Sequence, residues 1–283
     1  MWRRCWRRCV GWWQLARCWP EAHEGRDVVS GPALVYPMTH FLLETLAYVV
    51  AARLYWRASA GTAQPSARDR WLLLGCAIFG AALGSKLLHV LEHLPALRER
   101  HDLMLWIGGK SVLGGFLGGT FGVELGKRAI GWRHATGDAW VMPISVGLII
   151  GRLGCQLSGL WDQTYGNATS APWGWDYGDR IARHPVAAYE MIGVALLALV
   201  VRARWREYPG ARFAAFLLGY CVLRLALEFF KPPFGPVAPG TLPVALYGGL
   251  TAIQWAALLG IAWYGLLLRR RLKGPVSIDF PAS

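Results

Sequence analysis

Long apolar blocks separated by short polar linkers constrain the fold of this chain more than any other feature of its sequence. Each block runs for roughly 18–25 residues, the length of helix that crosses about 30 Å of hydrocarbon. Hydrophobic residues make up 54% of the sequence and charged residues only 17%, so few charges interrupt the blocks. The pattern predicts an all-α, polytopic integral membrane protein with about seven transmembrane helices. The predicted helices occupy approximately residues 33–56, 71–94, 103–126, 138–159, 186–203, 212–230 and 243–268.

The net charge of +13 lies mainly in the linkers between these blocks. Because no basic stripe with interleaved aromatic residues occurs in a soluble module, we expect no nucleic-acid partner. The positive-inside rule places the more basic linkers in the cytoplasm, which predicts a cytoplasmic C-terminus and, with an odd helix count, an external N-terminus. The basic residues on the predicted cytoplasmic side are Arg53, Arg57, Arg68, Arg70, Lys127, Arg128, Arg133, Arg202, Arg204, Arg206, Arg212, Arg269, Arg270, Arg271 and Lys273.

The chain divides into three parts on composition. Residues 31–273 form the predicted membrane domain, and residues 274–283 form a short cytoplasmic tail. Residues 1–30 are rich in Arg, Trp and Cys, and they contain neither a spanning run nor the apolar core of a signal peptide. We expect them to be a dispensable extension or an over-long start. Their Cys and His spacing matches no zinc pattern, and we expect no metal or other cofactor in the protein.

Two arginines lie in or beside the apolar blocks. Arg152 follows a run of mostly apolar residues, and Arg224 lies within GYCVLRLALEFF. An arginine at membrane depth costs at least ~2.5–3.5 kcal/mol on insertion scales, so it should be paired, line a cavity or bind an anion. Tyr220, Arg224 and Glu228 are spaced by four and share one helical face. The pattern predicts a site for an anionic headgroup. In the alternative interpretation, Arg224 pairs with Glu228 and Arg152 reaches the membrane surface.

Two further polar patterns allow several interpretations. In the second block, His89 and His93 could be hydrated at the interface, contact a headgroup or, with helical zinc-pair spacing, bind a metal. The stretch GGKSVLGG could pack closely against another helix, or it could be a broken element whose free amides face an anion. Cys155 lies three residues after Arg152 and could belong to its site, although the simplest interpretation is a small packing residue.

The order of several motifs resembles the prolipoprotein diacylglyceryl transferase family. These motifs are GGKSVLGG, GRLGCQLSG, TYGNAT, RHPVAAYE and GYCVLRLALEFFKPP, and the resemblance runs from about residue 32 to residue 264. It implies an enzyme of the bacterial plasma (inner) membrane. Such an enzyme transfers the diacylglyceryl group of phosphatidylglycerol to the lipobox cysteine in the signal peptide of a preprolipoprotein. The family typically has a histidine in its glycine-rich element, where this chain has Leu113, so the chain is identified as a divergent member.

The resemblance also implies the site residues. The residues expected in catalysis are Arg224, His184, Glu228 and Tyr220. The residues expected to bind substrate are Arg152, Gly154, Cys155, Gly159, Tyr189, Glu190, Gly114 and Gly115.

Alkylation of a thiol by a glycerol carbon needs a thiolate, cations on the leaving phosphate and two aligned substrates. Arg152 and Arg224 can serve the phosphate because a guanidinium binds phosphate with a planar fork. Because Leu113 cannot move a proton, the base must lie elsewhere. The candidates are His184, Glu228, His89 and Glu190.

Two other functions fit the same residues. One is a related transferase with a different lipid donor or acceptor. The other is a non-catalytic phospholipid-binding membrane protein that retains Arg152 and Arg224. Transfer from labelled phosphatidylglycerol to a lipobox peptide separates these possibilities.

Overall fold

The computed structural model describes residues 35–60, 62, 64–99, 106, 109–232 and 243–273. The predictions about residues 1–30 and 274–283 therefore lie outside the described residues. The described residues from Tyr36 onward belong to one compact unit. Its long helices are α2 (Val35–Ser59), α3 (Ala67–Glu99), α5 (Val112–Ala129), α6 (Val141–Leu157), α7 (Val186–Ala203), α8 (Ala211–Glu228) and α9 (Ala252–Lys273).

Shorter elements connect these helices. Two 3-10 turns, η2 (Asp138–Trp140) and η3 (Gly159–Asp162), flank α6. Strands β1 (Trp175–Asp176) and β2 (Ala182–Arg183) pair antiparallel, with Trp175 opposite Arg183. Strands β3 (Leu246–Tyr247) and β4 (Leu250–Thr251) form a second antiparallel hairpin directly before α9.

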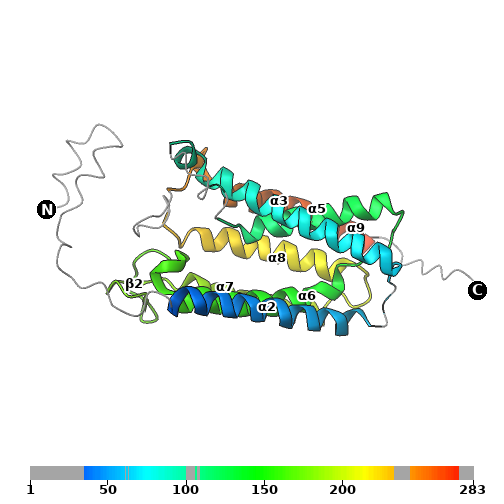
Figure 1. The fold of residues 1–283 in the computed structure, drawn as a ribbon, viewed down its shortest axis with the longest axis horizontal. Helices are drawn as coiled ribbons and strands as arrows, with labels where there is room; N and C mark the ends of the chain where they lie inside the picture. Colours follow the sequence, from blue (N-terminus) through cyan, green and yellow to red (C-terminus); the bar gives the residue numbers. More distant parts are fainter. Residues whose placement is uncertain are drawn as a thin grey trace, which may run out of the picture. The chain divides into compact units, whose positions relative to one another are not determined.

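Helix α8 is central to the packing. It contacts α7 on one side and α9 on the other, and it also contacts α5 and α6 (Figure 1). Helices α3 and α5 pack against each other along their length, because glycines face glycines between them. A Cβ atom on Gly118 would overlap the Gly80 carbonyl, and one on Gly114 would overlap that of Gly84. The close-packing interpretation therefore holds for the helical part of GGKSVLGG.

The loops gather at two opposite ends of the helices. At one end, the Asp138 carboxylate accepts backbone hydrogen bonds from Gly210 and Phe213, at 2.7 and 2.9 Å. Trp140 stacks there on Tyr55 of α2, with ring centroids 4.0 Å apart. At the other end, the loop between α6 and α7 is hydrogen-bonded to the residues that follow α8. The candidate site residues lie near this second end, which we call the site end.

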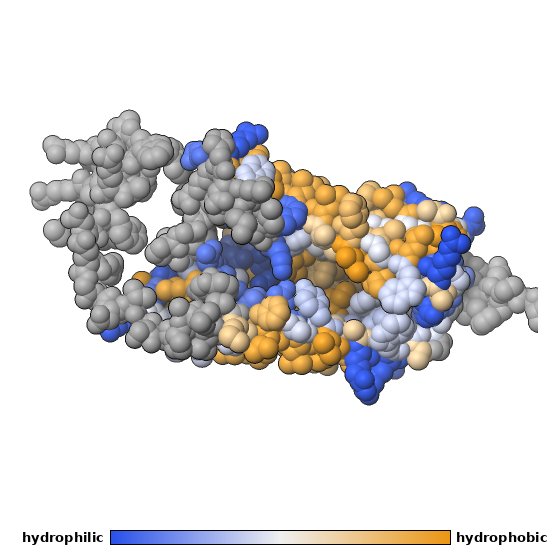
Figure 2. All heavy atoms as spheres, viewed as in Figure 1, coloured by the Kyte–Doolittle hydropathy of each residue, from blue (hydrophilic) through white to orange (hydrophobic). Residues whose placement is uncertain are grey.

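The surface and length of the helices fit a membrane protein. Within the described residues, four segments are long and apolar enough to span a bilayer: residues 67–99, 138–157, 186–203 and 252–273. Each of the other three long helices, α2, α5 and α8, carries three charged side chains. In Figure 2, hydrophobic residues cover the middle of the visible face and hydrophilic residues gather toward its ends. The all-α membrane class is confirmed, and the number of spanning helices stays a prediction.

One predicted boundary differs from the structure, and another falls outside the described residues. Helix α5 begins at Val112, because Ser111 caps it and Lys86 binds the Gly109 carbonyl outside the helix, with an Nζ–O distance of 2.8 Å. The start predicted near residue 103 lies outside the described residues. The seventh predicted helix begins at Ala252 rather than near residue 243, because a β-hairpin occupies the apolar residues before it.

The hairpin of β3 and β4 contacts α3 at a kink near Pro95. Pro95 has no backbone N–H and cannot donate to the carbonyl of Leu91, four residues earlier. That carbonyl accepts a hydrogen bond from the Tyr247 hydroxyl at 2.6 Å. His93 has non-helical dihedral angles, and its Nδ1 lies 3.1 Å from the Pro243 carbonyl oxygen. His93 therefore contacts the hairpin segment.

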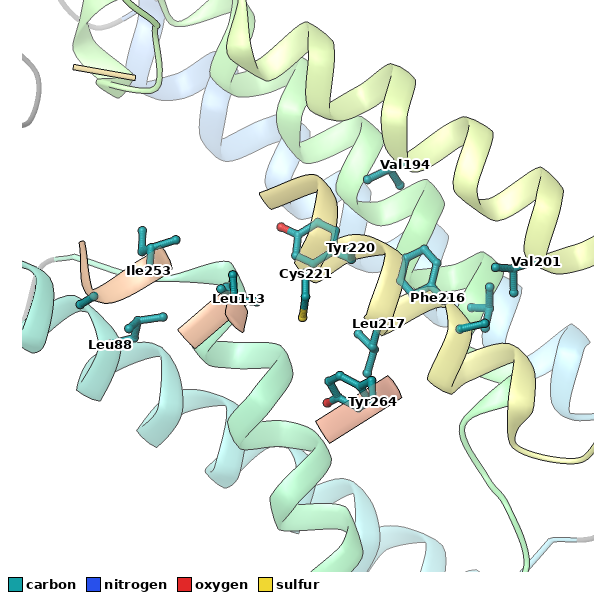
Figure 3. Close-up of a cluster of buried hydrophobic side chains, with 14 residues drawn as sticks. Leu88, Leu113, Val194, Val201, Phe216, Leu217, Tyr220, Cys221, Ile253 and Tyr264 are labelled. Carbon is teal, nitrogen blue, oxygen red and sulfur yellow. The ribbon is translucent and has the colours of Figure 1, made fainter. Parts of the chain in front are cut away.

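The apolar core occupies the region where α5, α8 and α9 meet. Leu113 is 1% exposed and belongs to this core with Ile253, Tyr220 and Cys221. Figure 3 shows Leu113 on α5 between Ile253 of α9 and the two α8 side chains. Leu113, which stands where the family's glycine-rich element typically has a histidine, is therefore a core packing residue.

Candidate active site

A buried carboxylate joins three helices near the site end. Glu190 on α7 is 1% exposed, and its Oε2 lies 3.0 Å from Arg152 Nε on α6 and 3.7 Å from Arg224 Nη1 on α8. The Tyr220 hydroxyl donates a hydrogen bond to the other oxygen, Oε1, at 2.8 Å. The structure thus brings together four residues that the sequence placed in three separate motifs.

The network continues along α8 to the residues that follow it. Arg224 Nη2 forms an ion pair with Glu228, whose Oε1 also lies 3.1 Å from Lys231 Nζ. Three cations and two carboxylates therefore form one continuous cluster, with a formal excess of one positive charge. Burying charge costs free energy unless every charge is paired and hydrogen-bonded.

One donor in this cluster has no hydrogen-bond acceptor. Arg224 is 4% exposed, and its Nη1 atom is buried without a hydrogen-bond partner, since Glu190 lies beyond hydrogen-bond distance. Because charge-assisted bonds from a guanidinium to phosphate are strong, an anionic oxygen placed here would complete the cluster. The arrangement can bind a phosphate oxygen at Arg224 Nη1, beside the Glu190 carboxylate that joins the two arginines.

Both interpretations of the arginines can be compared with this geometry. Arg224 and Glu228 do form the i,i+4 pair of the alternative interpretation. Arg152 does not reach the surface; its side chain is only 13% exposed and its ion-pair partner is Glu190. The carboxylate nearer in sequence, Asp162, faces His40 instead.

The loop between α6 and α7 is fastened to the end of α8. The backbone N–H of Asn167 donates to the Phe230 carbonyl at 2.8 Å, and its side-chain amide donates to the Lys231 carbonyl at 3.1 Å. Gly166 fits between two strands of backbone, where a Cβ atom would lie 2.8 Å from both the His184 and Phe230 carbonyl oxygens. The TYGNAT and RHP motifs therefore hold this loop over the charge cluster.

His184 and Tyr189 form a separate polar contact in this loop region. His184 Nδ1 lies 3.1 Å from the Tyr189 hydroxyl, which accepts a hydrogen bond from Trp173 Nε1 at 2.7 Å. Phe230 packs edge-on against the His184 ring. Because Tyr189 accepts from Trp173, its own proton can be donated to His184.

Gly159 and Tyr177 shape the start of the same loop. Gly159 has a φ of +64°, a left-handed conformation that favours glycine. The Tyr177 hydroxyl donates to Gln156 Oε1 at 3.0 Å, and burial raises the pKa of Tyr177 to about 12. These contacts position the loop, and the predicted substrate contact of Gly159 stays a prediction.

The backbone N–H groups of Gly114 and Gly115 are already used in hydrogen bonds to Ser111. The Gly114 N–H donates to Ser111 Oγ at 3.4 Å, and the Gly115 N–H donates to the Ser111 carbonyl at 2.9 Å. Both amides therefore belong to the N-terminal cap of α5, and substrate binding by these residues stays a prediction.

Helix α2 contributes residues that the sequence did not assign to the site. His40 Nδ1 lies 3.3 Å from Asp162 Oδ1, and His40 Nε2 lies 3.8 Å from Glu44 Oε2. Gly154 allows this approach, since a Cβ atom there would lie 3.6 Å from His40 Nδ1. In the sequence, His40 and Glu44 are one helical turn apart, which places them on one face of α2. This spacing does not indicate that Asp162 lies nearby.

Comparison with known proteins gives the chain a family. The family model described as prolipoprotein diacylglyceryl transferase matches residues 35–269. A phosphatidylglycerol–prolipoprotein diacylglyceryl transferase of Aromatoleum aromaticum is 35% identical over 254 residues, which cover 84% of this chain and 89% of the relative.

Two further relatives carry the same name. The protein of Erythrobacter litoralis is 30% identical, with 84% of this chain and 89% of the relative covered. That of Geobacter sulfurreducens is 31% identical, with 85% and 92% covered. The family model spans all seven long helices and the loop over the charge cluster. The chain therefore belongs to the prolipoprotein diacylglyceryl transferase family.

Proposed function

We propose that this protein transfers the diacylglyceryl group of phosphatidylglycerol to the thiol of a preprolipoprotein cysteine, the first step of bacterial lipoprotein maturation. The family assignment supports this reaction, and one structural observation connects it with the site. That observation is the buried cation cluster in which Arg224 Nη1 has no acceptor. A phospholipid headgroup carries the anionic oxygens that this cluster can bind.

In the proposed reaction, the acceptor sulfur attacks the glycerol carbon next to the phosphate. A C–S bond forms, the C–O bond breaks, and its electron pair leaves on the phosphate oxygen of glycerol phosphate. Arg152 and Arg224 stabilise the charge that grows on this oxygen, because cationic donors in a water-poor site act strongly on developing charge. Lys231 adds a third cation, and burial together with the nearby Arg224 lowers its pKa.

Glu190 positions the two arginines. Its Oε2 faces both guanidinium groups and its Oε1 accepts from Tyr220, so both oxygens are occupied. Glu228 is likewise held by Arg224 and Lys231. Neither carboxylate is well placed to take a proton from the thiol. Two histidines, His184 and His89, remain among the candidates, and a histidine suits proton transfer at neutral pH. We assign the base to His184, because it lies in the loop that is hydrogen-bonded to the end of α8. We assign substrate binding to Tyr189, to the signature glycines Gly154 and Gly159, and to Cys155.

We further propose that all seven long helices span the plasma membrane, with the N-terminus outside and the C-terminus in the cytoplasm. The helices alternate in direction between the two ends. The basic ends of α2, α5 and α9 lie away from the site end, whose loop would then face the exterior. A secreted preprolipoprotein would present its signal peptide there.

Reconstitution tests this proposal directly. Proteoliposomes containing the full chain and radiolabelled phosphatidylglycerol are incubated with a lipobox peptide, and label on the peptide is measured. A peptide with Ser in place of the lipobox Cys is the control. Transfer to the Cys peptide alone supports the proposal. Headgroup binding without transfer would instead favour the non-catalytic alternative, which the buried Leu113 makes worth testing.

A further inference from the structure

A second set of chemically active side chains lies beside the arginine cluster. His40 on α2, Cys155 on α6 and Asp162 in η3 each direct a metal-ligand atom toward the others, and these atoms lie within 4.8 Å of one another. His, Cys and Asp are all common zinc ligands in proteins. Cys155 is buried, while His40 and Asp162 are partly buried.

The separations fit a tetrahedral ion after a small adjustment. With bonds of about 2.0–2.3 Å, tetrahedral geometry places neighbouring donor atoms roughly 3.3–3.8 Å apart. His40 Nδ1 and Asp162 Oδ1 are already 3.3 Å apart. The widest separation in the group is at most 4.8 Å, so side-chain rotation of the order of 1 Å would bring all three donors into range.

The surroundings of His40 are compatible with ligation. Both of its ring nitrogens face carboxylates, Asp162 at Nδ1 and Glu44 at Nε2. Nδ1 is buried and has no partner with hydrogen-bond geometry. A ligating histidine commonly has a carboxylate behind its other nitrogen, as Glu44 is placed here. Thr164 donates to the second oxygen of Asp162 at 2.7 Å, which orients that carboxylate.

We propose that His40, Cys155 and Asp162 bind a divalent ion of the zinc class, and that the acceptor thiol occupies its fourth position. This proposal departs from the expectation, drawn from the sequence, that the protein holds no metal, and it rests on the proposed transferase function. Three protein ligands leave one position open, as in catalytic rather than structural zinc sites. A thiol that coordinates such an ion is deprotonated, which supplies the thiolate nucleophile.

The position of Arg152 links this ion to the phosphate site. Arg152 Nη1 donates to Cys155 Sγ at 3.8 Å while its Nε contacts Glu190. The acceptor sulfur would therefore bind beside the cations that hold the leaving group. Its proton passes to His184, the proposed base, and the C–S bond forms as the C–O bond to phosphate breaks. The ion compensates for the loss of the family histidine at Leu113.

Metal binding is tested without measuring transfer. The full chain, in nanodiscs and stripped of metal, is titrated with Zn²⁺ alone. Cys5, Cys9 and Cys18 are replaced by Ser in every sample to remove competing thiols. We expect one zinc equivalent, which Cys155→Ser and Asp162→Asn each remove while preserving side-chain size. Cys221→Ser, at a buried thiol outside the cluster, should leave it unchanged. Glu44→Gln should weaken binding by about 10–100-fold without removing it.

A spectroscopic experiment tests the role of the open position. Co²⁺ is bound in place of Zn²⁺, and its visible spectrum is recorded as a lipobox peptide is added. A change with the Cys peptide but not with the Ser peptide supports thiol coordination, and no change overturns that role. The absence of a zinc equivalent, or its survival in Cys155→Ser, would overturn the metal site. Transfer activity without zinc binding would reject the metal proposal alone, whereas zinc binding without transfer would reject the function.

Discussion

Replacement of Arg224 by Lys keeps one positive charge but removes the shape of the guanidinium group. Arg224 uses Nη2 for the Glu228 ion pair and directs Nη1 toward Glu190 and the unoccupied acceptor position. A lysine ammonium is a single point charge and cannot face two carboxylates and a phosphate at once. We therefore expect Arg224→Lys to lose transfer nearly as completely as Arg224→Ala.

The expected loss of transfer activity follows from the proposed role of Arg224 Nη1, which is to donate a hydrogen bond to the phosphate. Removing one pre-positioned donor from a developing oxyanion lowers kcat by about 10²–10³-fold, or about 2.7–4 kcal/mol. Arg152→Lys should show a loss of the same order, because Arg152 shares the Glu190 oxygen with Arg224. Since the two residues act on one phosphate, the double variant should lose less than the product of the single losses.

The assay is diacylglyceryl transfer in proteoliposomes, with each variant matched for membrane abundance. Arg202→Lys is the matched control, because this exposed arginine lies on α7 at the end away from Glu190. It should retain full activity. Near-normal rates for both Arg224→Lys and Arg152→Lys would refute a shared phosphate site.

Three other predictions test separate parts of the structure. His184→Ala should abolish transfer but leave phosphatidylglycerol binding intact, and unchanged turnover would contradict the assignment of the base to His184 and favour His89. A reporter fused after Phe280 should be active only in the cytoplasm, and external activity would contradict the orientation. Gly166→Ala should lower the free energy of unfolding by about 1–3 kcal/mol, because its methyl group would press on two carbonyl oxygens. Gly75→Ala, with open space around the new atom, is its control in a thermal unfolding assay, and equal stability of the two variants would contradict the packing at Gly166.

The sequence by itself determined the class of the protein and the positions of most helices. Bilayer thickness sets a minimum helix length, so the apolar blocks located α6, α7 and α8 within a few residues. The sequence also indicated that Arg152 and Arg224 need partners, because a cation in an apolar block is costly unless it has one, and the structure shows both in ion pairs. These features are local, and composition within one block is enough to reveal them.

The tertiary structure decided which distant residues meet. The sequence suggested that Glu190 binds substrate or acts as a base, but not that α7 places its carboxylate between Arg152 and Arg224. His40 reaches Asp162 only because α2 packs along α6 at Gly154. The hairpin at residues 246–251 replaced a predicted helical turn because the kink at Pro95 leaves the Leu91 carbonyl for Tyr247. Each of these contacts pairs a buried polar group with a partner on another element, and the choice among possible partners depends on how the helices pack.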